Sequence, residues 1–147
     1  MNYTNELLNR VNAVAQVLQN TPASTAEMKK EASGIIRELE EINFRFRGQP
    51  AKASSEEVQP ADVPLGDRLG ELAINSYSQS GNISQIVKDH LNILREEFPP
   101  VLERATKAGD DLQKLEKQMD VIKAPWTPGR VPKLRGRDKE QSDAAPQ

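Results

Sequence analysis

The sequence predicts an all-α fold: an antiparallel up-down four-helix bundle with one long, kinked C-terminal helix and an extended Pro/Gly tail. Three observations support it. Apolar residues recur at alternating spacings of four and three within residues 83–122, the heptad pattern of a helix packed along a seam. Hydrophobic residues make up 36% of the chain but aromatic residues only 4%, which favours narrow aliphatic seams. No alternating run of β-branched or aromatic residues indicates a strand.

The first helix is expected over residues 4–19. Its apolar stripe has a spacing of three, four and three, and is broadened on one side by two further residues. The stripe consists of Leu8, Val11, Ala15 and Leu18, broadened by Leu7 and Val14. Pro22 in the segment 20–22 ends the helix.

A second helix is expected to begin at a capping box formed by Ser24 and Glu27. Its seam has an unbroken four-three repeat and comprises Met28, Ala32, Ile35, Leu39, Ile42 and Phe46. Gly34 costs about 1 kcal/mol relative to Ala inside a helix, so we expect it to permit a close approach of another helix. Gly48 is placed to cap the C-terminus in a left-handed conformation.

Residues 48–63 are predicted to be a mobile linker between two helix pairs, because Pro, Ala, Ser and Glu bury little surface. Asp62 followed by Pro64 begins a third helix, which Ser80-Gly81 ends. One face of this helix is expected to carry Leu65, Leu69 and Leu72. Gly66 and Gly70 lower its helix propensity, and their spacing resembles a small-residue helix contact.

Asn82 with Gln85 forms a second capping box, at which the fourth helix begins. Its seam comprises Val87, Leu91, Leu94, Phe98, Val101, Ala105, Ala108, Leu112, Leu115, Met119 and Ile122. Pro99 and Pro100 interrupt it, each at a cost of about 3 kcal/mol in a helix interior. Because the seam keeps its phase beyond them, we expect one helix of about 60 Å, kinked near Phe98. The alternative is two helices, the second opening at Pro99.

Short connections predict that the first two helices form one antiparallel pair and the last two another. Residues 1–123 are then a helical bundle, and residues 124–147 an extended, partly disordered tail. The fourth helix is too long for the third to cover it. Its far half, with Leu112, Leu115 and Met119, should lie against the first two helices or against another subunit.

Charge and composition exclude several classes of function. The net charge is −2 and there is no cysteine. Residues 123–147 hold six Lys or Arg but also three Asp or Glu that interrupt the basic run, which is unlike a nucleic-acid footprint. No apolar run is long enough to span a membrane, and residues 1–20 lack the pattern of a signal peptide.

The chain is predicted to be non-catalytic and to hold no cofactor or metal. His90, its only histidine, immediately precedes the seam residue Leu91 and is expected to flank the core. The carboxylate pairs 96–97 and 110–111 are adjacent on a helix, so they do not converge on one site. Hydrolase activity of its own, depending on His90, is the least favoured hypothesis.

The segment 124–132 is the most distinctive stretch, because it is rich in proline and carries the only tryptophan. A proline-stiffened segment can bind in a groove at low entropic cost. Trp126, Pro128 and Arg130 are therefore candidate interaction residues. Two interpretations remain: Trp126 covers the end of the bundle, or the segment binds another domain or chain.

Four stretches occur in a recognisable order: PLGDRL at 64–69, EFPPVL at 97–102, DDLQKLE at 110–116 and APWTPGRVP at 124–132. This order resembles the C-terminal helical region of sortilin-like BNR (Asp-box) β-propeller proteins, which are often labelled glycosyl hydrolases. The resemblance covers residues 4–135, and the last stretch is its most specific part.

The resemblance implies a helical structural and interaction module appended to a propeller, with that propeller or a second copy of the chain as its partner. The hydrolase label belongs to the propeller repeats, whose Ser-x-Asp-x-Gly-x-Thr-Trp boxes do not occur here, so no catalytic residue carries over. The parent family is often exported. The alternative is an autonomous helical adaptor that binds a separate protein or peptide through the long helix or the Trp126 segment.

Overall fold

The computed structural model describes residues 2–48, 62–78 and 84–132, and this part of the chain contains four helices and no strand. The helices are α1 (Asn2–Asn20), α2 (Ala26–Arg47), α3 (Leu65–Ser78) and α4 (Gln85–Val121). The predicted all-α bundle is thus confirmed. The predicted linker and the end of the tail fall on residues 49–61 and 133–147, which lie outside the described residues.

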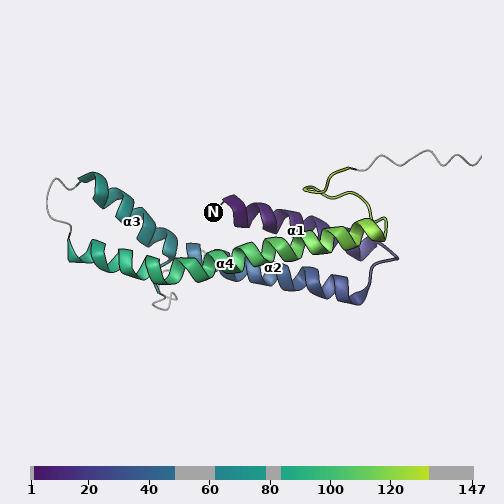
Figure 1. Cartoon of the computed structure of the whole chain (residues 1–147), viewed down its shortest axis with the longest axis horizontal. Helices are drawn as coiled ribbons and strands as arrows, with labels where there is room; N and C mark the ends of the chain where they lie inside the picture. The colour runs from purple at the N-terminus through teal and green to yellow at the C-terminus, as the bar shows by residue number, and fades with distance from the viewer. Residues whose placement is uncertain (1, 49–61, 79–83, 133–147) are drawn as a thin grey trace, which may run out of the picture.

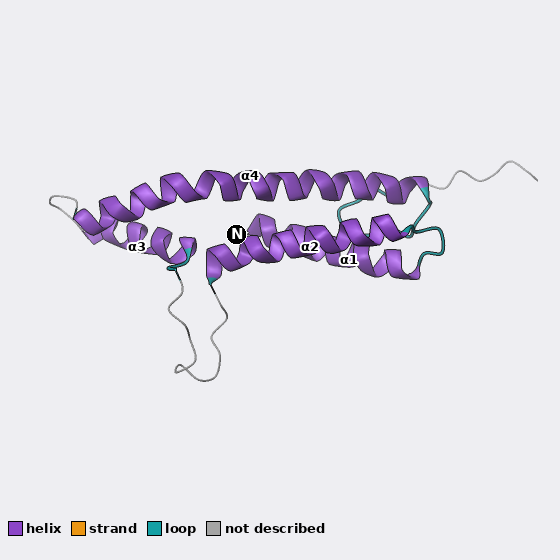
Figure 2. Ribbon diagram, turned by 90° about the horizontal axis from the view of Figure 1, so that it is seen from below, coloured by secondary structure: helices purple, strands orange, loops and turns teal. Residues whose placement is uncertain are grey.

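The longest helix, α4, organises the molecule (Figures 1 and 2). Its C-terminal part packs against the antiparallel pair α1 and α2, and we call this assembly, with residues 101–121 of α4, the three-helix half. Its N-terminal part, residues 85–100, packs against α3 and forms the two-helix half. Because α2 and α3 run in the same direction along α4, a strict up-down alternation is not confirmed (Figure 1).

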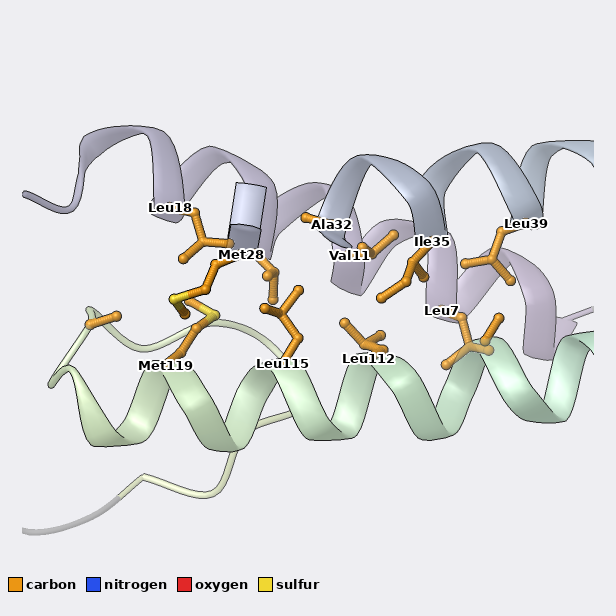
Figure 3. Packing of buried hydrophobic residues seen from close by; sticks show 13 residues of the cluster. Leu7, Val11, Leu18, Met28, Ala32, Ile35, Leu39, Leu112, Leu115 and Met119 are labelled. Carbon is orange, nitrogen blue, oxygen red and sulfur yellow. The ribbon is translucent and has the colours of Figure 1, made fainter. Parts of the chain in front are cut away.

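The main core lies in the three-helix half, where side chains of α1 and α2 point toward Leu112, Leu115 and Met119 of α4 (Figure 3). The buried residues of this cluster are Leu7, Val11, Val14, Leu18, Met28, Ala32, Ile35, Leu39, Ala108, Leu112, Leu115, Met119 and Ala124. The far half of α4 therefore packs within its own chain, the first of the two predicted alternatives.

The stripe that α1 buries differs from the predicted one. Leu7 and Val14 are buried with Val11 and Leu18, whereas Leu8 and Ala15 are only partly buried. Val11 and Leu18 belong to both stripes, and the exchange of Leu8 and Ala15 for the predicted flanking residues Leu7 and Val14 turns the centre of the stripe by about 50°. Because α1 contacts both α2 and α4, it rotates toward Leu7 and Val14.

The seam of α2 is confirmed, but its N-terminal cap is not the predicted one. Thr25 is the N-cap residue, and its hydroxyl accepts a hydrogen bond from the Met28 amide at 3.2 Å. The hydroxyl of Ser24 instead donates to the Leu18 carbonyl at 2.6 Å, which ties the turn to α1. Gly48 caps the C-terminus with φ 71°, as predicted.

A second, smaller core lies where the two halves meet. It comprises Ile42, Leu65, Leu94, Val101 and Ala105, with Phe46 and Leu72 packed against it. The prediction that Leu69 joins Leu65 and Leu72 on the packed face of α3 is wrong, because Leu69 is 57% exposed.

The helix α4 is continuous through Pro99 and Pro100, which confirms one helix rather than two, and its axis bends in its N-terminal half (Figures 1 and 2). Both prolines are exposed. Lacking amide hydrogens, they leave the carbonyls of Arg95 and Glu96 without their usual helical donors. Those two residues are also exposed to solvent, which can hydrate the unpaired carbonyls.

The seam of α4 is buried more fully beyond the prolines than before them. From Val101 to Met119 every predicted seam residue is buried, whereas Leu91 and Phe98 are 38% and 39% exposed. Phe98 makes an edge-to-face contact with Phe46 at 6.0 Å between ring centroids. Ser84 caps α4 by accepting from the Val87 amide at 3.4 Å, and the predicted cap, Asn82, lies outside the described residues.

Candidate interaction site

After α4 the chain reverses and folds back over the three-helix half (Figure 1). Lys123 takes a left-handed conformation with φ 54°, and the Ala124 amide donates to the Met119 carbonyl at 3.0 Å. Ala124 is buried and joins the main core. We call residues 124–132 the return segment.

Thr127 and Gly129 pack the return segment against the helices. Thr127 is 1% exposed, and its carbonyl accepts from the Arg130 amide at 3.2 Å to close a turn. Gly129 has φ 92°, and a Cβ added there would lie 2.2 Å from Nε of Arg10 on α1. Only glycine satisfies both the backbone conformation and this close contact.

Beneath this turn, a largely buried ion pair joins α1 to α4. Nη2 of Arg10 lies 2.9 Å and 2.8 Å from the two carboxylate oxygens of Glu116, and the side chains are 19% and 9% exposed. Removing one partner of such a pair leaves a charge without compensation. No sequence pattern indicates this pair, because its members are 106 residues apart.

Arg130 stabilises the return segment by hydrogen bonds to Asp120 at the end of α4 and to Pro125 within the segment. Its Nε donates to Oδ1 of Asp120 at 3.1 Å, Nη2 bonds the same oxygen, and Nη1 donates to the Pro125 carbonyl at 2.7 Å. The Arg130 side chain is only 8% exposed. This residue therefore positions the segment, and its guanidinium is not presented to a partner.

The indole N–H of Trp126 is hydrogen-bonded within the return segment, while much of the side chain is exposed to solvent. The indole Nε1 donates to the Arg130 carbonyl at 2.7 Å, yet the residue is 57% exposed. Pro128 is exposed beside it, and Val121 and Val131 are 81% and 82% exposed. Ala124 and Thr127 of the same segment are buried, whereas more than half of the Trp126 surface is exposed to solvent.

The six predicted interaction residues fall into three groups. Trp126 and Pro128 are exposed, and Arg130 is internal to the return segment. Leu112, Leu115 and Met119 are each 0% exposed within the main core. The structure brings the first two groups together and gives the third an intramolecular partner.

Three of the groups considered for chemistry lie beside side chains outside that set. His90 Nδ1 lies 2.9 Å from Glu71 of α3, Glu97 pairs with Arg45, and Asp111 pairs with Lys114 at 2.8 Å. Within residues 2–48, 62–78 and 84–132, no three His, Asp or Glu side chains are grouped so as to hold a metal ion.

A hollow of about 270 Å³ lies between α2 and α4 and is lined by Gly34, Ile35, Glu38, Arg104, Lys107, Ala108 and Asp111. Arg104 crosses beside it to Glu38 at 2.6 Å and Glu41 at 3.0 Å. The hydrogen bond from Arg104 holds the pKa of Glu38 below its ordinary value of 4.5 and raises the pKa of the guanidinium. Because its charges neutralise one another, the hollow is a gap in side-chain packing rather than a charged binding site.

The predicted close helix approach at Gly34 is wrong, since a Cβ added there meets nothing within 4 Å. The close approach is at Gly109 of α4, where an added Cβ would lie 2.4 Å from the hydroxyl of Tyr3 and 3.5 Å from Leu7 of α1. Gly109 thus leaves room for the Tyr3 side chain of α1 beside α4.

The chain matches no protein-family model, no curated protein and no solved structure. Among the described helices, none has a stretch apolar enough, over sufficient length, to cross a membrane.

Proposed function

We propose that the chain is a non-catalytic helical interaction module that presents Trp126 to a partner protein from a preformed turn. The observation that carries the proposal is the combination of an exposed indole ring with an indole N–H already bonded inside the turn. The bundle supplies the rigid support, and the return segment supplies the contact.

Preorganisation is the physical basis of this proposal. Binding loses affinity to the ordering of loops and side chains, and a segment that is already ordered avoids much of that cost. Here Arg130 fixes the turn through Asp120 and the Pro125 carbonyl. Tryptophan is enriched among the residues that dominate binding energy, because it buries a large area with few rotatable bonds.

The partner we propose first is a propeller domain, on the resemblance of this chain to the helical ends of BNR-repeat proteins. Reading the coding frame upstream of Met1, together with the mass of the native polypeptide, tests this directly. Asp-box blades continuous with this segment would support a structural appendage on a propeller. A native product of 16.4 kDa would favour the autonomous adaptor instead.

The role of Trp126 itself is tested by substituting it, and it is the only tryptophan in the chain. Trp126→Ala should leave the melting temperature nearly unchanged, since an exposed side chain contributes little to stability. It should also abolish retention of a partner that the unaltered chain captures from an extract of the source organism, while Val131→Ala should not.

Two results would contradict the proposal. A clear drop in melting temperature for Trp126→Ala would show that the indole serves the bundle end instead. Identical sets of proteins retained by the unaltered chain and by Trp126→Ala would remove the contact role.

A further inference from the structure

All three carboxylates within residues 111–132 are paired with cations of the same chain. The pairs are Asp111 with Lys114, Glu116 with Arg10 and Asp120 with Arg130. The side chains of the two arginines are only 19% and 8% exposed. The acidic groups at this end of α4 are therefore neutralised by the chain itself.

Two exposed lysines, Lys117 and Lys123, lie at the same end of α4. Among the residues that the structure describes, neither lysine forms an ion pair. Residues 11–26, at the adjoining end of α1 and in the turn to α2, contain no charged residue, and residues 27–31 contain two of each sign. This end of the three-helix half therefore presents positive charge that the fold does not neutralise.

Both lysines border the return segment. Lys117 precedes Asp120 by one helical turn, and Asp120 accepts hydrogen bonds from Arg130. The carbonyl of Arg130 in turn accepts the indole N–H of Trp126 at 2.7 Å. Lys123 has the left-handed conformation at the chain reversal, three residues before Trp126. We call Lys117, Lys123 and Trp126 the basic end.

The basic end combines cationic and apolar groups. Trp126 is 57% exposed, and Val121 and Val131, on either side of it along the chain, are 81% and 82% exposed. Protein interfaces bury aromatic residues at their centre and keep charged residues at their rim, where complementary charge speeds association. Two lysines beside an indole favour carboxylates on the partner. They do not form the longer basic stripe that binds a nucleic-acid backbone.

We propose that the basic end binds an acidic, apolar segment of a partner protein, with carboxylates beside Lys117 and Lys123 and an aliphatic side chain against the face of Trp126. This inference rests on the proposed function and specifies the chemistry of its partner. The preformed turn and the apolar contact hold the segment, whereas the two charges guide its approach. Because those charges lie at the surface, added salt weakens the contact.

The first experiment titrates the full chain into a short fluorescein-labelled peptide of alternating glutamate and leucine and follows the anisotropy of the label. Binding should raise the anisotropy, and the midpoint should move to higher protein concentration as sodium chloride is added. The same peptide with lysine in place of glutamate should bind at least about tenfold more weakly. The emission of Trp126, the only tryptophan, should shift to shorter wavelength when the unlabelled acidic peptide covers the ring.

Charge reversal at the two lysines tests their part in binding. Lys117→Glu/Lys123→Glu should weaken binding of the acidic peptide about tenfold with unchanged helicity, because both side chains are exposed. Lys88→Glu/Arg95→Glu is the matched control, since it makes the same change in net charge at exposed positions of the two-helix half. It should bind the peptide as the unaltered chain does. Trp126→Ala should weaken binding about tenfold or more, because it removes the apolar contact.

Several results would overturn the inference. The acidic peptide could fail to bind, or the lysine peptide could bind equally well. The control variant could lose as much affinity as Lys117→Glu/Lys123→Glu. A shift of Trp126 emission with phosphatidylserine vesicles, and none with the acidic peptide, would assign the basic end to an anionic membrane surface instead.

The inference and the proposed function fail in different ways. If Trp126→Ala loses the partner captured from an extract while Lys117→Glu/Lys123→Glu retains it, the contact role of Trp126 stands and the acidic partner is ruled out. If both variants retain that partner, the proposed function fails and the inference fails with it.

Discussion

The two halves of α4 have the same kind of sequence and very different surroundings. Both carry an apolar four-three seam, yet Leu112 is 0% exposed and Leu91 is 38% exposed. The difference is the number of helices beside the seam. In the part of the chain that the structure describes, α1 and α2 lie along the C-terminal half, whereas α3 lies along the N-terminal half and α2 reaches only its last turns, at Leu94 and Phe98 (Figure 1).

This difference shows that a heptad seam specifies which residues face inward but not how completely they are covered. In the three-helix half, α1 and α2 enclose Leu115 from two sides. In the two-helix half, α3 contributes Leu65 to the core and turns Leu69 outward. Stability should therefore be concentrated in the three-helix half, whereas the seam of the two-helix half is left partly exposed.

The largest expected effect comes from deleting core volume in each half. Leu112→Ala should lower the free energy of unfolding by about 3 kcal/mol, because the site is enclosed and cannot collapse. Leu94→Ala, at the edge of the second core with 8% exposure, should cost about half as much. Urea denaturation followed by circular dichroism measures both. Equal losses would show that the two halves are packed equally well.

A second contrast concerns carboxylates. Glu116→Gln should cost about 2 kcal/mol, because it leaves the guanidinium of Arg10 largely buried without its counter-charge. The matched change Glu71→Gln, in the two-helix half, should cost less than about 0.5 kcal/mol, since Glu71 is 54% exposed beside His90. If the two variants proved equally stable, water would have to reach the pair under the return segment.

Glycine substitutions test how much space lies beside α2 and α4 in the three-helix half. Gly34→Ala should raise stability by about 1 kcal/mol, because the added methyl group meets open space and improves helix propensity. Gly109→Ala should not, because its Cβ would meet the Tyr3 hydroxyl. Repeating Gly109→Ala in a Tyr3→Ala background should restore the gain. Thermal unfolding measures each, and a loss of stability with Gly34→Ala would contradict the open hollow.

The smallest expected effect is a dependence on pH. The pKa of Glu38 is depressed below 4.5, so its ion pair with Arg104 stabilises the fold above that pH, and the contribution is lost as the pH falls through the folded-state pKa. Both side chains are more than one-third exposed, so the effect is about 0.5 kcal/mol or less. Glu38→Gln should reduce the acid sensitivity by that amount, and an unchanged stability curve between pH 3 and 6 would refute it.

Much of the fold could be predicted from periodicity alone. The α2 seam from Met28 to Ile42 is buried as expected, because its spacing leaves one choice of face. In α1, two stripes compete one residue apart, and contacts from both α2 and α4 decide for Leu7 over Leu8. Such a choice depends on the tertiary arrangement and cannot be read from one helix.

The candidate site was only partly predictable. A lone tryptophan among prolines drew attention to Trp126, but the internal role of Arg130 depends on Asp120 and on the turn at Gly129. The pairing of Arg10 with Glu116 depends on α1 crossing α4. Contacts between residues distant in sequence follow from the assembled fold, and neither residue type nor spacing indicates them.

The two prolines of α4 also determine how the molecule opens. They remove two successive hydrogen bonds from one continuous helix, because no amide at 99 or 100 can donate to the carbonyls of the preceding turn. Fraying that starts at Gln85 therefore ends at a boundary already present in the native backbone. We therefore expect amide protons before the prolines to exchange with solvent sooner than those of the turns packed under α1 and α2.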